Sequence, residues 1–151
     1  MAESKGNTIR LHRVMQAPPD RIYKAFTDPD AMAKWLPPNG FFGKVHEMDA
    51  RVGGGYKMSF TNLTTGHVES FGGKYLELIP GEKIVHTDKF DNPALVGEMV
   101  VTINLKKVSV GTDIDITQEN IPSMIPVEGC YLGWQEALAL LEMLVEAEIS
   151  E

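Results

Sequence analysis

The strongest constraint on the fold is one long helical pattern at the end of the chain, after a region that predicts only short strands. In residues 126–151 the apolar side chains recur at steps of three and four, which places them on one stripe of a helix. The stripe consists of Val127, Cys130, Tyr131, Trp134, Leu138, Leu141 and Val145. A single long helix after a run of strands predicts a sheet that curls around that helix. Such an arrangement often leaves a hollow between sheet and helix.

The rest of the chain predicts one strand, two short helices and six more strands. Residues 8–16 alternate as a strand does, and Pro19 and Asp20 suit the first turn of a helix. This helix ends before Pro29, because proline disfavours the helical conformation in the residue before it. A second short helix is expected from Pro29 to Leu36. The six strands are expected near 41–49, 56–60, 67–79, 83–90, 98–107 and 112–118.

The element order is therefore β-α-α-β6-α, which makes this an α+β chain. Short turns between successive strands predict antiparallel pairing. The pair Gly72–Gly73 predicts a bulge or sharp bend within its strand. We expect a helix-grip fold, in which a curved antiparallel β-sheet of about seven strands wraps around the long C-terminal helix. Residues 1–7 are expected to form a flexible tail, and 8–151 a single domain.

Length, net charge and composition limit the kinds of partner that the chain can have. A length of 151 residues favours one domain, and the net charge of −7 argues against nucleic acid and against anionic lipid surfaces. No run approaches the roughly 18–20 apolar residues of a membrane span, so no membrane insertion is expected. The start, MAESKGNT, lacks the apolar segment of a secretion signal. The single cysteine, Cys130, allows no intramolecular disulfide, and a cytoplasmic location is expected.

Several short motifs occur together in a characteristic order. They are APPDRIY at 17–23, FTDP at 26–29 with Trp35, MDARVGG at 48–54, ELIPGE at 77–82, Gly111–Thr112 and Gly133–Trp134. In this order they resemble the START-like superfamily (SRPBCC, birch-pollen-allergen-like). Within it, the chain is similar to the branch named after the C-terminal domain of the activator of heat shock protein 90 ATPase. The resemblance covers about residues 9–146.

The resemblance implies the fold more firmly than an activity. The superfamily includes lipid carriers, hormone receptors, polyketide cyclases and aromatases, and a shared fold does not select among them. The motif residues look structural, so no catalytic role is carried over from them. The branch name implies a co-chaperone or stress-response partner. The full eukaryotic activator, however, has a separate N-terminal domain, and only about eight polar residues precede the fold here.

No pattern predicts a metal site, a cofactor or a catalytic residue. The four histidines, His12, His46, His67 and His86, do not have the spacing of zinc ligands. His86 alternates with Asp88, and a buried histidine beside a carboxylate can act as a general base. An exposed strand face or a structural histidine is the favoured interpretation. With Tyr75, these two residues are the first candidates if the protein is a cyclase, aromatase or hydrolase. Cys130 is expected to be a small core residue.

The best-supported prediction is a non-catalytic pocket for a small hydrophobic or amphipathic ligand, lipid-like or polyketide-like, between the sheet and the C-terminal helix. Mostly apolar walls with a few polar points are typical of small-molecule pockets. The same side chains could instead meet and fill the core, and the sequence leaves both outcomes open. It also leaves open whether the protein is a monomer or a homodimer paired through a sheet edge. The predicted ligand-binding residues are Trp35, Phe42, Tyr56, Met58, Phe60, Tyr75, His86, Met99, Val101, Ile103, Trp134 and Leu138.

Overall fold

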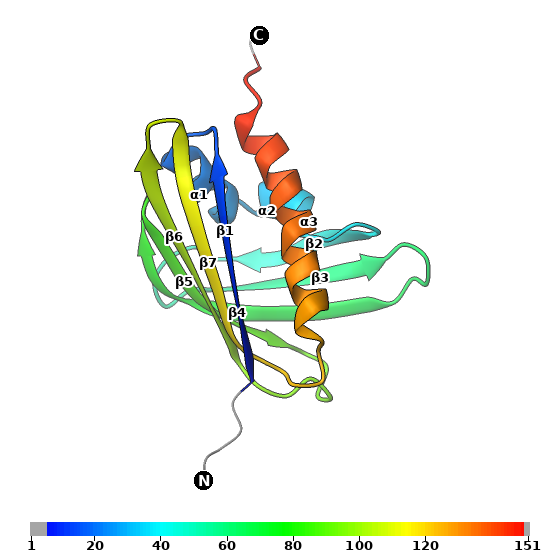
Figure 1. Ribbon diagram of the computed structural model, residues 1–151. Helices are drawn as coiled ribbons and strands as arrows, with labels where there is room; N and C mark the ends of the chain where they lie inside the picture. Colours follow the sequence, from blue (N-terminus) through cyan, green and yellow to red (C-terminus); the bar gives the residue numbers. More distant parts are fainter. Residues whose placement is uncertain (1–5, 150–151) are drawn as a thin grey trace.

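A seven-stranded antiparallel sheet carries the fold of the computed structural model, which describes residues 6–149 (Figure 1). The strand order across the sheet is β1-β7-β6-β5-β4-β3-β2. The predicted helix-grip arrangement is thus confirmed, with the expected order of elements. Along the chain these are β1 (Asn7–Met15), α1 (Pro19–Thr27), α2 (Pro29–Trp35), β2 (Phe41–Met48), β3 (Gly55–Asn62), β4 (Val68–Ile79), β5 (Lys83–Phe90), β6 (Met99–Val108), β7 (Gly111–Ile121) and α3 (Val127–Glu146).

The sheet is strongly bent, so that β2, β3 and β4 run across the direction of β1, β6 and β7 (Figure 1). The β4–β5 register shifts between Tyr75 and Glu77, a few residues beyond the position predicted for a bulge. Gly73 contributes in another way. A Cβ atom there would lie 1.8 Å from the carbonyl oxygen of Thr87, so only glycine lets the two strands approach this closely.

The two short helices begin as the prolines predict. Pro19 and Pro29 both stand in a first helical turn, where a missing N–H costs nothing. The Asp28 side chain caps α2 by accepting hydrogen bonds from the backbone N–H groups of Asp30, at 2.9 Å, and Ala31, at 3.3 Å. Trp35, at the end of α2, is buried, and its Nε1 donates to the Ala25 carbonyl at 2.9 Å. This bond holds α2 against α1.

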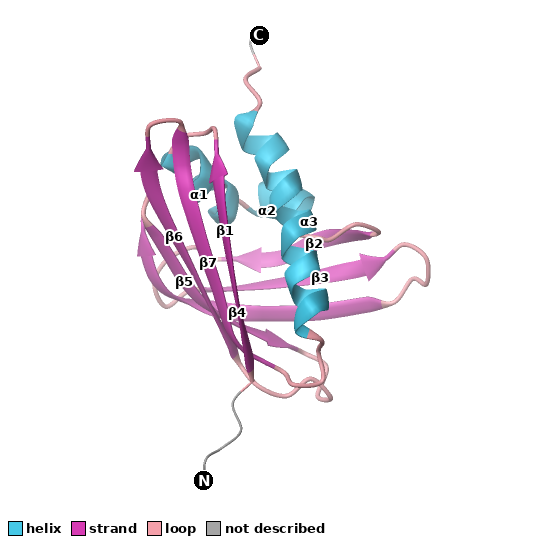
Figure 2. Cartoon of the chain, viewed as in Figure 1, coloured by secondary structure: helices cyan, strands magenta, loops and turns pink. Residues whose placement is uncertain are grey.

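The long helix α3 lies across the concave side of the sheet (Figure 2). Its C-terminal half packs into the core through Leu138, Leu141 and Val145, all at most 2% exposed. Each fully buried aliphatic side chain of this size stabilises the fold by roughly 1.5–3 kcal/mol. Arg13 pairs with Glu142 at 3.1 Å, which ties this half to β1. The Arg21 guanidinium also donates to the last turn, at the carbonyl of Val145, 2.9 Å away.

Two boundaries and the burial of one residue differ from the predictions. The helix is shorter than predicted: α3 ends at Glu146, Ala147 is in an extended conformation, and Ile149 is 85% exposed. Tyr131, assigned to the buried stripe, is 41% exposed. The predicted tail, 1–7, is too long, since Asn7 belongs to β1 and the Gly6 N–H donates to the Asn120 side chain. Residues 1–5 and 150–151 lie outside the described part of the chain.

Candidate functional site

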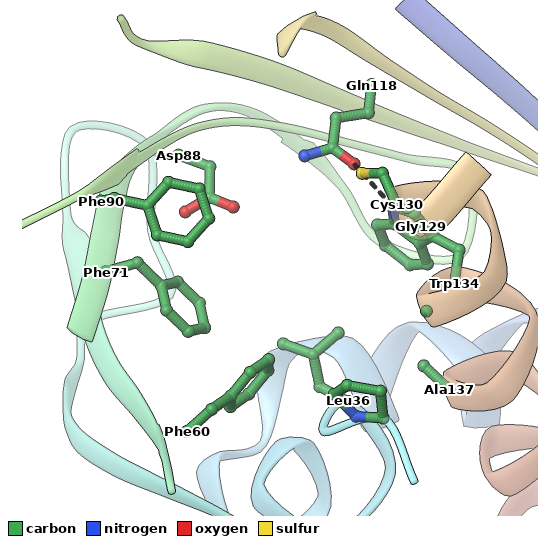
Figure 3. A pocket seen from close by; sticks show the side chains of 12 residues that line it. Leu36, Phe60, Phe71, Asp88, Phe90, Gln118, Gly129, Cys130, Trp134 and Ala137 are labelled. Atoms are coloured by element: carbon green, nitrogen blue, oxygen red, sulfur yellow. Dashed lines mark hydrogen bonds between the residues drawn. The ribbon is translucent and has the colours of Figure 1, made fainter. Parts of the chain in front are cut away.

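A cavity of about 200 Å³ lies between the N-terminal half of α3 and the inner face of the sheet (Figure 3). Four strands, the first half of α3 and the segment after α2 contribute to its wall. Most of the wall is aromatic or aliphatic, with few polar side chains. The lining residues are Leu36, Pro38, Phe60, Phe71, Asp88, Phe90, Gln118, Gly129, Cys130, Gly133, Trp134 and Ala137.

Three phenylalanines from neighbouring strands form the wall on the sheet side. Phe71 on β4 pairs directly with Phe90 on β5, and their ring centroids lie 6.2 Å apart. Phe60 on β3 is diagonal to Phe71, because its direct partner is Glu69, and these two rings meet edge to face at 4.8 Å. Cross-strand pairing therefore places three rings side by side, as Figure 3 shows.

On the helix side, α3 presents small residues at steps of four. Gly129, Gly133 and Ala137 lie on one face, and Cys130 and Trp134 lie beside them. No heavy atom lies within 4 Å of a Cβ atom built on Gly129 or Gly133. Glycine inside a helix costs roughly 0.5–1 kcal/mol relative to alanine. Here the missing side chains leave the cavity unfilled.

Gln118 is the polar link between the two walls. Its side chain is buried, and its Oε1 accepts two hydrogen bonds, from Trp134 Nε1 at 2.7 Å and from Cys130 Sγ at 3.3 Å (Figure 3). Its Nε2 donates to the sulfur of Met99 at 3.1 Å. Burial, and secondarily the charge of Asp88, raises the pKa of the Cys130 thiol, which keeps it protonated as a donor. Gln118 thus fixes the tryptophan ring at the cavity.

Asp88 is the one acidic side chain of the wall among the described residues. Its Oδ1 is buried and has no hydrogen-bond partner in the described part of the chain. Burial raises the pKa of Asp88 to about 7, although the nearby Tyr56 hydroxyl and Lys89 backbone N–H act in the opposite direction. Near neutral pH this group therefore exchanges between carboxylic acid and carboxylate.

His86 lies behind the wall rather than in it. Its Nδ1 is 2.8 Å from the carbonyl oxygen of Thr87, and its ring packs edge-on against Tyr56 at 5.3 Å. Burial lowers the pKa of His86 and raises that of Tyr56 well above its ordinary value, so both are neutral. Tyr75 is also buried outside the cavity wall. Of the three residues considered for catalysis, only Asp88 reaches the cavity.

The twelve predicted ligand-binding residues fall into three groups. The first group lies at the cavity: Phe60 and Trp134 line it, and His86 is partly buried beside it. Phe42 is 51% exposed and does not line it; its neighbour Phe41 faces Phe60, with ring centroids 6.4 Å apart. The remaining eight are core residues: Trp35, Tyr56, Met58, Tyr75, Met99, Val101, Ile103 and Leu138. Any role in ligand binding stays a prediction.

Several residues of the cavity wall were not predicted from the sequence, although the strand pattern around some of them indicated their position. Gln118 follows Ile114 and Ile116 at steps of two, so it is a polar residue at the end of an inward-facing row. Phe90 continues the same kind of row on β5, which starts at Ile84 and contains Asp88, a residue already considered as a catalytic candidate. A polar side chain that interrupts such a row at the end of the sheet marks a place where the core opens.

Other candidate sites are weaker. Within residues 6–149, no group of three histidine, cysteine, aspartate or glutamate side chains could hold a metal ion. A hollow of about 480 Å³ around Gly72 and Gly73 is bordered by charged side chains, among them Lys57, Lys89 and Glu98. In the same part of the chain, no helix is long and apolar enough to cross a membrane.

Comparisons with known proteins agree with this architecture. The family model described as Activator of Hsp90 ATPase homolog 1-like protein matches residues 16–146. A crystal structure from Chromobacterium violaceum is 58% identical, covers 94% of this chain and 99% of its own, and superposes with a TM-score of 0.93. No curated protein matches the chain.

More distant structures share the fold alone. A protein from Rhodobacter sphaeroides is 20% identical, with a TM-score of 0.79 over 92% of this chain and 93% of its own. A protein from Staphylococcus epidermidis, solved by NMR, is also 20% identical, with a TM-score of 0.79 over 99% and 96% of the two chains. The sheet bent around a terminal helix therefore persists at low sequence identity.

Proposed function

The chain belongs to the Activator of Hsp90 ATPase homolog 1-like family, and within that frame we propose that it binds a small apolar or amphipathic ligand in the cavity between α3 and the sheet. The observation that carries the proposal is the unfilled space itself. The hollow is partly open to solvent, and its walls of three phenylalanines, a tryptophan and two helix glycines leave mostly apolar surface uncovered. Mostly apolar walls with a few polar groups are typical of small-molecule pockets.

The cavity's size limits the ligand. Its volume of about 200 Å³ is below the roughly 300–1,000 Å³ of typical ligand pockets. Apolar cavities of about 150 Å³ are known to take up benzene. The proposed ligand is therefore a molecule, or the end of a molecule, of about one ring in size, rather than a whole lipid chain.

The first experiment is native mass spectrometry of protein purified from its own host, beside a denatured sample. We expect an added mass that disappears on denaturation and identifies the carried ligand. In parallel, benzyl alcohol is titrated into labelled protein and followed by amide NMR. Resonances of Gln118, Gly129 and Gly133 should shift together and saturate.

A variant that plugs the cavity gives the decisive control. Gly133→Leu adds a branched side chain to a position where no heavy atom lies within 4 Å of a built Cβ. It should abolish the saturable NMR shifts. Ala139→Leu adds the same kind of side chain to an exposed position of the same helix and should leave them intact. If benzyl alcohol does not bind, or if it binds both variants equally, the cavity is not the ligand site.

A chaperone partner is a second candidate function, favoured by the family description alone. The outer face of α3 exposes Leu132, Met143 and Leu144, which could contact another protein. The test is a pull-down from host lysate, followed by measurement of the ATPase rate of the host's heat shock protein 90. No co-purified chaperone and no change in that rate would remove this candidate.

A further inference from the structure

The cavity wall contains an acceptor without a donor. Asp88 Oδ1 is buried and has no hydrogen-bond partner in the described residues. Leaving a buried acceptor unpaired costs about 1–3 kcal/mol, and more for a charged one. Gln118, the other polar side chain of the sheet wall, has its Oε1 occupied by two donors. The unmet hydrogen-bonding capacity therefore belongs to an acid, and a ligand that satisfies it must supply a donor.

The charge around this acid is also unbalanced. Among the described residues that line the cavity, none is lysine, arginine or histidine. A buried carboxylate is stable only when a positive group or several hydrogen bonds compensate it. The wall supplies no positive group, so a proton or a cationic ligand would compensate the charge of this carboxylate. The net charge of −7 also favours the approach of cations over anions.

The aromatic rings favour the same kind of ligand. Phe60, Phe71 and Phe90 form one side of the cavity and Trp134 lies across from them, with the Asp88 carboxyl group near Phe90 (Figure 3). The faces of such rings attract cations, most strongly at tryptophan, and the attraction grows when the cation is desolvated. Rings on two sides and one carboxyl group make a suitable environment for an organic ammonium group.

We propose that the cavity recognises a small organic amine in its protonated form, with Asp88 as its counter-ion and the surrounding aromatic rings as its apolar and cation–π contacts. This inference rests on the proposed ligand-binding function and names the chemical class of the ligand. The volume of about 200 Å³ limits the enclosed part to about one ring with a short aminoalkyl arm. No covalent step is involved.

The test uses two probes of nearly equal shape and different charge, benzylamine and benzyl alcohol. Both are titrated into the full-length protein at pH 8 by NMR and calorimetry, because the amine is then protonated and Asp88 is ionised. We expect benzylamine to bind at least tenfold more tightly than benzyl alcohol. In Asp88→Asn, which keeps the side-chain shape, this preference should fall below twofold. Asp115→Asn removes the same charge from the outer surface, where Asp115 pairs with Arg10, and should keep the preference.

The pH profile of the unmodified protein gives a second measurement that needs no variant. The benzylamine affinity should fall severalfold between pH 8 and pH 5.5, as Asp88 takes up a proton, while the benzyl alcohol affinity stays level. The other titratable groups around Asp88 are Tyr56 on β3, His86 on β5 and Cys130 on α3. Burial favours the neutral form of all three, so Asp88 is the group expected to change charge through most of this range.

The outcomes separate this inference from the proposed function. If benzyl alcohol binds as tightly as benzylamine, or if Asp88→Asn keeps the preference, the cavity binds ligands but does not select amines. An affinity for benzylamine that rises toward pH 5.5 would likewise overturn the role of the carboxylate. If neither probe binds, both the amine inference and the proposed ligand-binding function are wrong.

Discussion

Replacing Gly133 with alanine should make the protein more stable and a poorer ligand binder at once. Alanine is favoured over glycine in a helix interior by about 0.8–1.0 kcal/mol. No heavy atom lies within 4 Å of the added Cβ, so no steric cost offsets this gain. The free energy of unfolding should therefore rise by about 1 kcal/mol. For a chain of this length that corresponds to an increase in Tm of about 2–4 °C.

The assay is urea unfolding followed by far-UV circular dichroism, with the midpoint shifting and the slope unchanged. Ala139→Gly, at an exposed position of the same helix, measures the propensity difference in the opposite direction and should cost about 1 kcal/mol. In Gly133→Ala the new methyl group enters the cavity, so the affinity for benzyl alcohol should also fall. If Gly133→Ala destabilises the protein while Ala139→Gly behaves as expected, the space beside α3 is closed and the reasoning is refuted.

Three further predictions test the other wall elements. Asp88 has a pKa of about 7 in the folded protein against an ordinary 3.8, so the wild type should lose stability relative to Asp88→Asn as pH rises from about 4 to 7. The loss should be at most on the order of 4 kcal/mol and should level off above pH 7. Urea unfolding midpoints of the two proteins across this pH range measure the loss, and a stability difference that does not change with pH would mean that Asp88 has an ordinary pKa. Gln118→Leu leaves the Trp134 Nε1 donor unpaired and should lower the free energy of unfolding by about 1–3 kcal/mol. In a double-mutant cycle, combining it with Trp134→Phe should lower this free energy by less than the sum of the two single effects. Gly73→Ala places a Cβ 1.8 Å from the Thr87 carbonyl oxygen on β5 and should lower the free energy of unfolding by at least about 3 kcal/mol. Gly66→Ala, in a turn with open space but a φ of +78°, should lower it by only about 1–2 kcal/mol. Equal decreases in Tm for the two variants would contradict the tight β4–β5 contact.

Much of the fold could be predicted from local pattern. Alternation marked the strands, and Pro19, Pro29 and Asp28 marked the helix starts, because these signals act within a few residues of where they occur. The end of α3 could not be predicted this way. Residues 147–149 do not continue the helix beyond Glu146, and nothing in their local pattern indicated where contact with the sheet stops.

Only part of the cavity wall could be predicted from the sequence. Phe60 and Trp134 were identified, whereas Met58, Ile103 and Leu138 turned out to fill the core. A side chain that faces the cavity and one that faces the core have the same periodicity, because both point to the concave side of the sheet. What distinguishes them is the residue on the opposite wall, and that residue is far away in the sequence.

The sequence by itself determined the order of the elements, the alternation within the strands and the apolar side of the last helix, since each depends on neighbours along the chain. Only the tertiary structure decided that Gly129 and Gly133 face three phenylalanines across a gap, and that Oδ1 of Asp88 lies buried beside it without a partner among residues 6–149. The physical reason is that a cavity is a property of two surfaces together. Its existence depends on the bend of the sheet, the β4–β5 register and the position of α3, none of which is local to the residues that line it.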